Sequence, residues 1–206
     1  MRKLLTEFIG TFFLVLTIGL TVTAGSQFAP LAIGTSLMIM VYMGGHISGG
    51  HYNPAVSLAA LMRGALPSGD FLPYVVSQVA GATVAALVVN IITGQTFAPA
   101  PAATASTLGA LLVELLYTFA LALVVLNVAT SKKTEGKGFY GLAIGFTVVC
   151  AAFAAGGISG GAFNPAVGTA LTISGDAGFA QLWLYWVGPL VGGALAGVVF
   201  KVQEGA

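Results

Sequence analysis

The chain has 206 residues, of which 57% are hydrophobic and only 6% are charged. Ordinary soluble domains carry about 25% charged residues, so this composition excludes a soluble globule and predicts a polytopic membrane protein. Seven Lys and Arg residues supply no basic patch for nucleic acid, and a single cysteine, Cys150, excludes a disulfide framework.

Six stretches of roughly 20 mostly apolar residues are long enough to cross the hydrocarbon core of a bilayer as helices. In chain order, the predicted spans are 4–24, 28–47, 71–93, 108–129, 139–158 and 180–200. The first stretch could also be the apolar part of a signal peptide. Because no small-residue cleavage site stands before the second span, we expect it to be a helix of the mature protein.

The positively charged residues all fall on one side of this predicted topology. They belong to the N-terminus, to the loops after the second and fourth spans, and to the C-terminus: Arg2, Lys3, Arg63, Lys132, Lys133, Lys137 and Lys201. The opposite loops contain neither Lys nor Arg. The positive-inside rule therefore predicts that both termini lie in the cytoplasm, and we expect a multi-pass protein of the plasma or inner membrane.

The two halves of the sequence repeat each other. A shift of 111 residues aligns GHISGGHYNPAV with GGISGGAFNPAV, and the segments 45–56 and 156–167 share nine of twelve residues. Each half holds three spans, an odd number, so the second copy must enter the membrane from the opposite side and form an inverted repeat. We expect one domain, 1–206, made of a first repeat, a connecting loop and a second repeat at 1–93, 94–107 and 108–206.

Each repeat carries Asn-Pro-Ala after its second span, as Asn53-Pro54-Ala55 and Asn164-Pro165-Ala166. The apolar segments that follow, 54–62 and 165–173, are too short to span a bilayer and predict re-entrant half-helices. Asn is a favoured N-cap, and Pro is favoured at the first helical position. A simple turn would explain one copy of this motif, but not two copies at matched positions.

Two such caps meeting head to head would place two positive helix-dipole ends at the middle of the membrane. If each Asn oxygen caps its own helix, each side-chain NH2 group is left as a hydrogen-bond donor. This arrangement favours a neutral solute that bears an oxygen atom, and it repels cations.

The doubled Asn-Pro-Ala, the GHISGGHYNPAV segment and the TEFIGTF opening resemble the major intrinsic protein family, the aquaporins and glycerol facilitators, over residues 4–200. The resemblance implies an all-α, right-handed bundle of six transmembrane helices with two re-entrant half-helices. It also implies a passive channel domain for water and small neutral solutes, embedded in the lipid bilayer as a homotetramer with one pore per protomer.

The sequence departs from this family at the outer constriction, where water channels carry an aromatic residue, a His, a small or polar residue and an Arg. Matched by distance from each Asn, these positions are Ile33, Ala152, Gly161 and Val167. Such side chains predict a wide, apolar and uncharged opening that admits solutes larger than water. The Asp that glycerol facilitators carry after the Arg is also missing, because Gly168 stands there. Tyr185-Trp186 on the last span looks more like a water channel.

Two acidic residues, Glu7 and Glu114, lie at matched positions inside predicted spans. A carboxylate within the membrane is a candidate for ion transport, but a symmetric pair can also hold backbone N–H groups of the re-entrant loops. The resemblance implies the second, structural role. His46 is expected to line the cytoplasmic vestibule, and His46 with His51 lacks the Cys or acidic partner that a metal site requires.

Other functions remain open from the sequence. A proton- or ion-coupled secondary transporter is the main alternative, because such carriers also use inverted repeats and broken helices. An ion channel is a second, since the absence of an Arg lowers the field against cations. A structural role in membrane junctions is a third. We expect no enzyme, metal or cofactor, because no catalytic set of side chains occurs at usable spacing.

Overall fold

The computed structural model describes residues 1–174 and 179–205, without the side chains of 171–174 and 179. All regular secondary structure in these residues is helical. Six of the described helices are long and apolar enough to cross a membrane. They are α1 Arg2–Thr23, α2 Ala29–Ser48, α4 Ser68–Thr93, α5 Thr107–Thr130, α6 Tyr140–Ser159 and α8 Leu182–Glu204.

All six predicted spans are confirmed, with differences only at their ends. Helix α4 begins earlier than predicted, because Ser68 and Asp70 form a polar first turn that a search for apolar residues does not detect. Helix α8 continues beyond the predicted end through Lys201 to Glu204 for the same reason.

Two ten-residue helices, α3 Pro54–Arg63 and α7 Pro165–Ser174, follow the two Asn residues. Ten helical residues are about 15 Å long, roughly half of the 30 Å hydrocarbon core. They therefore have the length of the predicted half-helices. Two single 3-10 turns, η1 Lys132–Thr134 and η2 Phe179–Gln181, complete the described elements.

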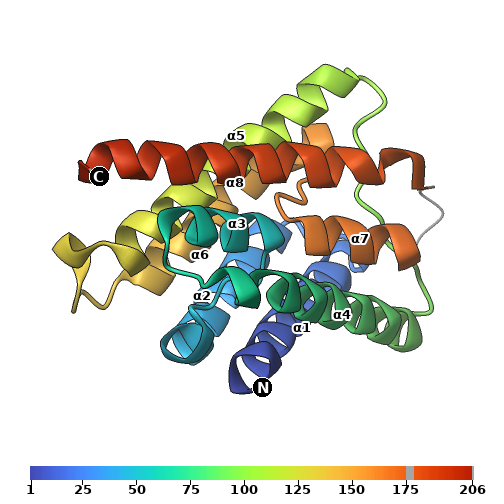
Figure 1. Cartoon of the computed structure of the whole chain (residues 1–206). Helices are drawn as coiled ribbons and strands as arrows, with labels where there is room; N and C mark the ends of the chain where they lie inside the picture. Colours follow the sequence, from blue (N-terminus) through green and yellow to red (C-terminus); the bar gives the residue numbers. More distant parts are fainter. Residues whose placement is uncertain (175–178, 206) are drawn as a thin grey trace.

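The packing of the helices follows the internal repeat. Helix α1 packs against α4 as α5 packs against α8, and α2 meets its counterpart α6. Each half-helix packs against the third span of the other repeat, α3 against α8 and α7 against α4. Figure 1 shows α3 and α7 between these two long helices. The two repeats are thus interlocked at the centre of the bundle.

Glycine allows the closest of these helix contacts. A Cβ atom on Gly81 of α4 would overlap the carbonyl oxygen of Phe8 on α1, and one on Gly192 of α8 would overlap that of Leu115 on α5. Small residues let helix backbones approach in this way within membranes. The two contacts occupy equivalent places in the two repeats.

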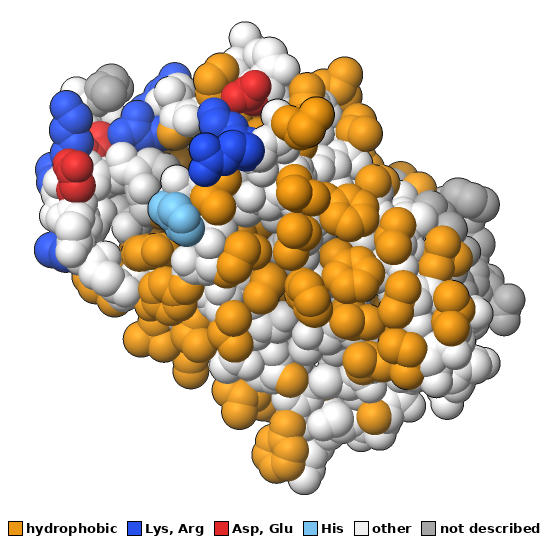
Figure 2. Space-filling view, turned by 90° about the horizontal axis from the view of Figure 1, so that it is seen from below, with side chains coloured by type: hydrophobic (Ala, Val, Ile, Leu, Met, Phe, Trp, Pro, Cys, Tyr) orange, Lys and Arg blue, Asp and Glu red, His pale blue; other side chains and the backbone are white. Residues whose placement is uncertain are grey.

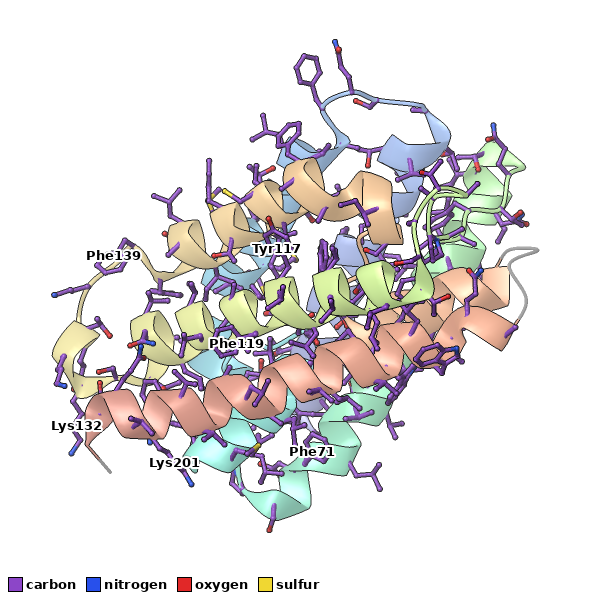
Figure 3. All side chains as sticks on the ribbon, turned by 90° about the horizontal axis from the view of Figure 1, so that it is seen from above. Phe71, Tyr117, Phe119, Lys132, Phe139 and Lys201 are labelled. Carbon is purple, nitrogen blue, oxygen red and sulfur yellow. The ribbon has the colours of Figure 1, made fainter. Side chains whose placement is uncertain are left out.

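The outer surface has the distribution of side chains expected for a protein in lipid. Large apolar side chains face outward, such as those of Leu72, Ile91 and Leu108, which are 67%, 80% and 64% exposed. On the face seen in Figure 2, Lys and Arg gather toward one end and hydrophobic side chains are spread over the rest. Lys132 and Lys201 lie together at one end of the bundle in Figure 3.

Candidate functional site at the junction of the half-helices

The two Asn side chains cap the half-helices. Asn53 Oδ1 accepts a hydrogen bond of 2.9 Å from the backbone N–H of Ala55, and Asn164 Oδ1 accepts one of 2.9 Å from that of Ala166. Pro54 and Pro165 occupy the first helical position, where a backbone N–H would have no partner within the helix. The local geometry predicted from Asn-Pro-Ala is therefore present in both copies.

The side-chain amides of these Asn residues also connect the two repeats. Asn53 Nδ2 donates to the carbonyl oxygen of Phe163 over 2.9 Å, and Asn164 Nδ2 donates to that of Tyr52 over 2.8 Å. The sequence predicted that each NH2 group would be free to meet a solute. In the structure, one N–H of each side-chain amide donates to the opposite loop, and the second N–H of that amide remains as a donor for a solute.

An unusual backbone conformation makes these cross-connections possible. Tyr52 and Phe163, the residues directly before the two Asn, have φ angles of +49° and +48°. Bulky residues rarely adopt this left-handed region, which costs about 1–2 kcal/mol per residue. It turns each carbonyl toward the opposite Asn. Sequence reasoning missed this feature, although two aromatic residues at matched places before Asn were a visible signal.

Glu7 of α1 holds the first re-entrant loop. Its Oε1 accepts hydrogen bonds from Ser48 Oγ at 2.6 Å and from the backbone N–H of His51 at 3.0 Å. Its Oε2 accepts one from the backbone N–H of Tyr52 at 2.7 Å and one from Gln78 Nε2 at 2.8 Å. The carboxylate is fully buried and surrounded by donors.

Glu114 of α5 makes the equivalent set of bonds in the second repeat. Its Oε1 accepts from Ser159 Oγ at 2.7 Å and from the N–H of Ala162 at 3.0 Å, and its Oε2 accepts from the N–H of Phe163 at 2.6 Å. This carboxylate is also fully buried. Both sets of bonds fit the structural role considered for these residues.

A cavity of about 240 Å³ lies where the half-helices meet. Its walls include Asn53 and Asn164 together with all four positions matched to the family's outer constriction: Ile33, Ala152, Gly161 and Val167. Aliphatic side chains of α1, α2, α5 and α6 form most of the remaining wall. Among the described residues that line the cavity, Asp, Glu, Lys and Arg are absent.

His46 lies elsewhere. Its exposed side chain borders a separate recess with Arg2, Lys3, Asp70 and Tyr74, at the start of α1 and α4. The cavity between the half-helices is lined instead by the other histidine, His51. The structure thus brings the Asn pair and the four constriction positions together, and it places His46 outside this group.

His51 belongs to a buried polar cluster that sequence analysis missed. Its Nδ1 lies 3.1 Å from Ser57 Oγ, and Gln78 Nε2 donates to both Ser57 Oγ at 2.9 Å and Glu7 Oε2. These residues differ between the two repeats, so the internal repeat does not point to them. Their counterparts under the shift of 111 residues are Ala162, Gly168 and Pro189.

Comparisons with known proteins show which family the chain resembles. The family model described as major intrinsic protein matches residues 1–200. The chain is 38% identical over 208 residues to Aquaporin NIP1-1 of Zea mays, covering 95% of this chain and 72% of that protein. It is 37% identical over 219 residues to Glycerol uptake facilitator protein-like 6 of Lactiplantibacillus plantarum, covering 98% of each.

Among solved structures, the aquaglyceroporin from Plasmodium falciparum has the same fold, with a TM-score of 0.82 over 98% of this chain and 94% of that one, at 24% sequence identity. The match of the family model over nearly the whole chain, together with these relatives, shows that the chain belongs to the major intrinsic protein family.

Proposed function

We propose that this protein is a passive transmembrane channel for water and small uncharged solutes. The observation that carries the proposal is the cavity at the junction of α3 and α7. It brings two capped helix N-termini and two amide donors together with aliphatic walls, and its described lining holds no Asp, Glu, Lys or Arg. The names of the relatives, which include an aquaporin and a glycerol uptake facilitator, support the same class of function.

The chemistry of the cavity selects neutral solutes. Helix N-termini carry partial positive charge, which opposes the entry of cations. Aliphatic walls do not replace the hydration shell of an ion, so any ion would pay a large desolvation cost. A neutral solute with an oxygen atom has a smaller desolvation cost, because the remaining N–H groups of Asn53 and Asn164 can donate to that oxygen.

The four constriction positions extend the proposal to solutes larger than water. Ile33, Ala152, Gly161 and Val167 present aliphatic surface and no charge, so carbon-bearing solutes are not excluded by a fixed guanidinium. We propose that glycerol and urea cross together with water.

The coupled-transporter alternative is disfavoured by the position of the two carboxylates. Glu7 and Glu114 are fully buried, bond the re-entrant loops, and are not among the described residues that line the cavity. A carboxylate that binds and releases a coupling proton needs access to the pathway.

The test is osmotic swelling and shrinking of liposomes that contain the purified protein, measured by stopped-flow light scattering with water, glycerol and urea gradients. All three should equilibrate faster than in protein-free liposomes, without saturation and without response to an imposed proton gradient. Saturable or gradient-driven uptake would favour the carrier, ionic currents would favour an ion channel, and impermeable vesicles would favour a structural role.

Two neighbouring residues of α6 offer a matched control. Ala152 lines the cavity, and Phe153 faces outward with 59% of its surface exposed. Ala152→Trp should fill much of the cavity and remove the protein-dependent flux, whereas Phe153→Trp should leave it unchanged.

We further propose that the protein is a homotetramer and that both termini lie in the cytoplasm. Family membership supports the first point. The position of Lys132 and Lys201 at one end of the bundle supports the second. The mass of the detergent-solubilised particle tests the assembly, and labelling of lysines by a membrane-impermeant reagent in vesicles of known orientation tests the topology.

A further inference from the structure

The two re-entrant loops differ in one chemical respect. The first carries the buried polar residues His51 and Ser57, which meet Gln78 of α4, whereas Ala162, Gly168 and Pro189 stand at the equivalent places in the second. Among the described residues that line the cavity, His51 has the only imidazole. The tautomer of this residue therefore bears on what the pathway offers a solute.

The hydrogen bonds of Gln78 have a fixed direction. Its Nε2 lies 2.8 Å from Glu7 Oε2 and 2.9 Å from Ser57 Oγ, so both amide hydrogens are donated. Its Oε1 is buried and has no partner among the described residues. Rotating the amide by half a turn would place Oε1 against the carboxylate, an acceptor against an acceptor, so this orientation is the favourable one.

The donor direction at Gln78 determines which way the Ser57 hydroxyl donates, and this in turn determines the tautomer of His51. Ser57 Oγ accepts from Gln78, which leaves its own hydrogen to be donated, and the neighbouring atom at 3.1 Å is His51 Nδ1. When Nδ1 of a neutral imidazole accepts a hydrogen bond, the ring proton lies on Nε2. His51 Nε2 makes no hydrogen bond to a described residue, so it is the remaining donor of a residue that lines the cavity.

The groups around the ring are consistent with an uncharged imidazole held in one orientation. His51 is 9% exposed, and its ring packs against that of Tyr74 of α4 with a centroid distance of 5.4 Å. The acidic group facing it, Glu7, already receives the backbone N–H of His51 and the amide of Gln78.

We infer that Ser57 and Gln78 are positioning residues for His51, which they hold as the neutral tautomer with its proton on Nε2, so that the ring offers the pathway a donor and no acceptor. Together with the two Asn amides, the side chains at the centre of the pathway would then all present donors to a solute oxygen. The consequence for a solute rests on the proposed channel function, whereas the assignment of the tautomer does not depend on that function.

The test is nitrogen NMR of the full-length protein in lipid bilayers, with histidine labelled with ¹⁵N. The chain contains two histidines, so a His46→Asn parent leaves His51 as the only labelled ring. The expected spectrum at neutral pH shows one tautomer, with an unprotonated Nδ1 and a protonated Nε2. A proton on Nδ1, or a charged ring, would overturn the inference.

Variants of Ser57 test whether positioning is the cause. Ser57→Ala should lose the single-tautomer spectrum, and Ser57→Thr, which keeps the hydroxyl, should retain it. The matched control is Ser36→Ala, because the Ser36 hydroxyl bonds Thr17, outside the cluster. If Ser57→Ala gives the same spectrum as the parent, Ser57 does not position His51. If this variant does not fold, the spectrum of the parent still decides the tautomer.

The NMR measurement needs no transport, so it separates this inference from the proposed function. Liposomes that swell no faster than protein-free ones would overturn the channel and leave the tautomer to be decided by the spectrum. Rapid swelling with the wrong tautomer would overturn only the positioning by Ser57 and Gln78.

Discussion

The side-chain amide of Asn53 donates a hydrogen bond of 2.9 Å to the carbonyl oxygen of Phe163, a residue 110 positions away in the other repeat. The reciprocal bond runs from Asn164 to Tyr52. Each Asn therefore caps its own half-helix and holds the opposite loop. Because both tasks use the same side chain, the stability of the junction and the donors that it presents depend on each other.

We expect Asn164→Ala to destabilise the protein and to reduce its permeability to water. The variant loses an N-cap and leaves the buried carbonyl of Tyr52 without its donor, which together lower the free energy of unfolding by about 1.5–5 kcal/mol. The measurement is denaturant unfolding in detergent micelles, with liposome swelling in parallel.

Asn90→Ala is the control for this variant, because the Asn90 side chain is exposed on α4. It should change the free energy of unfolding by less than about 0.5 kcal/mol. Equal stability of the two variants would show that the cross-connection contributes nothing.

The long helices and the caps could be predicted from the sequence because each depends on local information. Span length follows from apolar runs, and Asn-Pro defines a helix start. The link from Asn53 to Phe163 was not predicted, because it depends on a left-handed backbone at Tyr52 and Phe163, a conformation that bulky residues rarely adopt. The connection of His51 to Gln78 through Ser57 joins distant segments without periodicity, and its residues are not repeated in the second half.

Glu7→Gln should destabilise the protein more than Glu114→Gln. Glu7 accepts four hydrogen bonds and Glu114 accepts three from the described residues. An amide must turn an N–H group toward one of these donors, which costs about 2–4 kcal/mol for a buried site. The measurement is again unfolding in micelles.

Glu135→Gln, in the exposed loop before α6, is the matched control and should be neutral. The same experiment separates a structural carboxylate from a transporting one. If Glu7→Gln is as stable as the parent but loses a flux that follows a proton gradient, the structural role is wrong and the coupled carrier is favoured.

Adding a methyl group to either Gly81 or Gly192 should separate a pair of helices. Because a Cβ atom at either place would overlap a backbone carbonyl of the facing helix, the change should cost about 1–3 kcal/mol. The free energy of unfolding of the two Gly→Ala variants should fall by similar amounts, since their contacts are equivalent in the repeat. Gly69→Ala is the control, because nothing lies within 4 Å of its added Cβ, and equal losses in all three variants would contradict the close packing.

Val167→Arg should narrow the outer constriction and make the pathway more selective. Val167 is 2% exposed and lines the cavity directly after the second Asn-Pro-Ala, so a longer side chain there extends into the cavity. Arg adds bulk, a fixed positive charge and five N–H donors. These donors can replace some of the hydrogen bonds that a water molecule loses when it leaves bulk water. We expect glycerol and urea permeability to fall about tenfold, equivalent to about 1.4 kcal/mol in the barrier, and water permeability to fall less.

Val167→Leu provides the comparison, because it enlarges the side chain without adding charge or donors. By bulk alone it should slow glycerol more than urea and urea more than water, so any preference for water beyond that of Val167→Leu comes from the charge and donors of Arg. Swelling rates of liposomes with equal protein content give the ratio of glycerol to water permeability for both variants. If Val167→Arg lowers all three permeabilities by the same factor, Val167 does not set the selectivity and the constriction lies elsewhere.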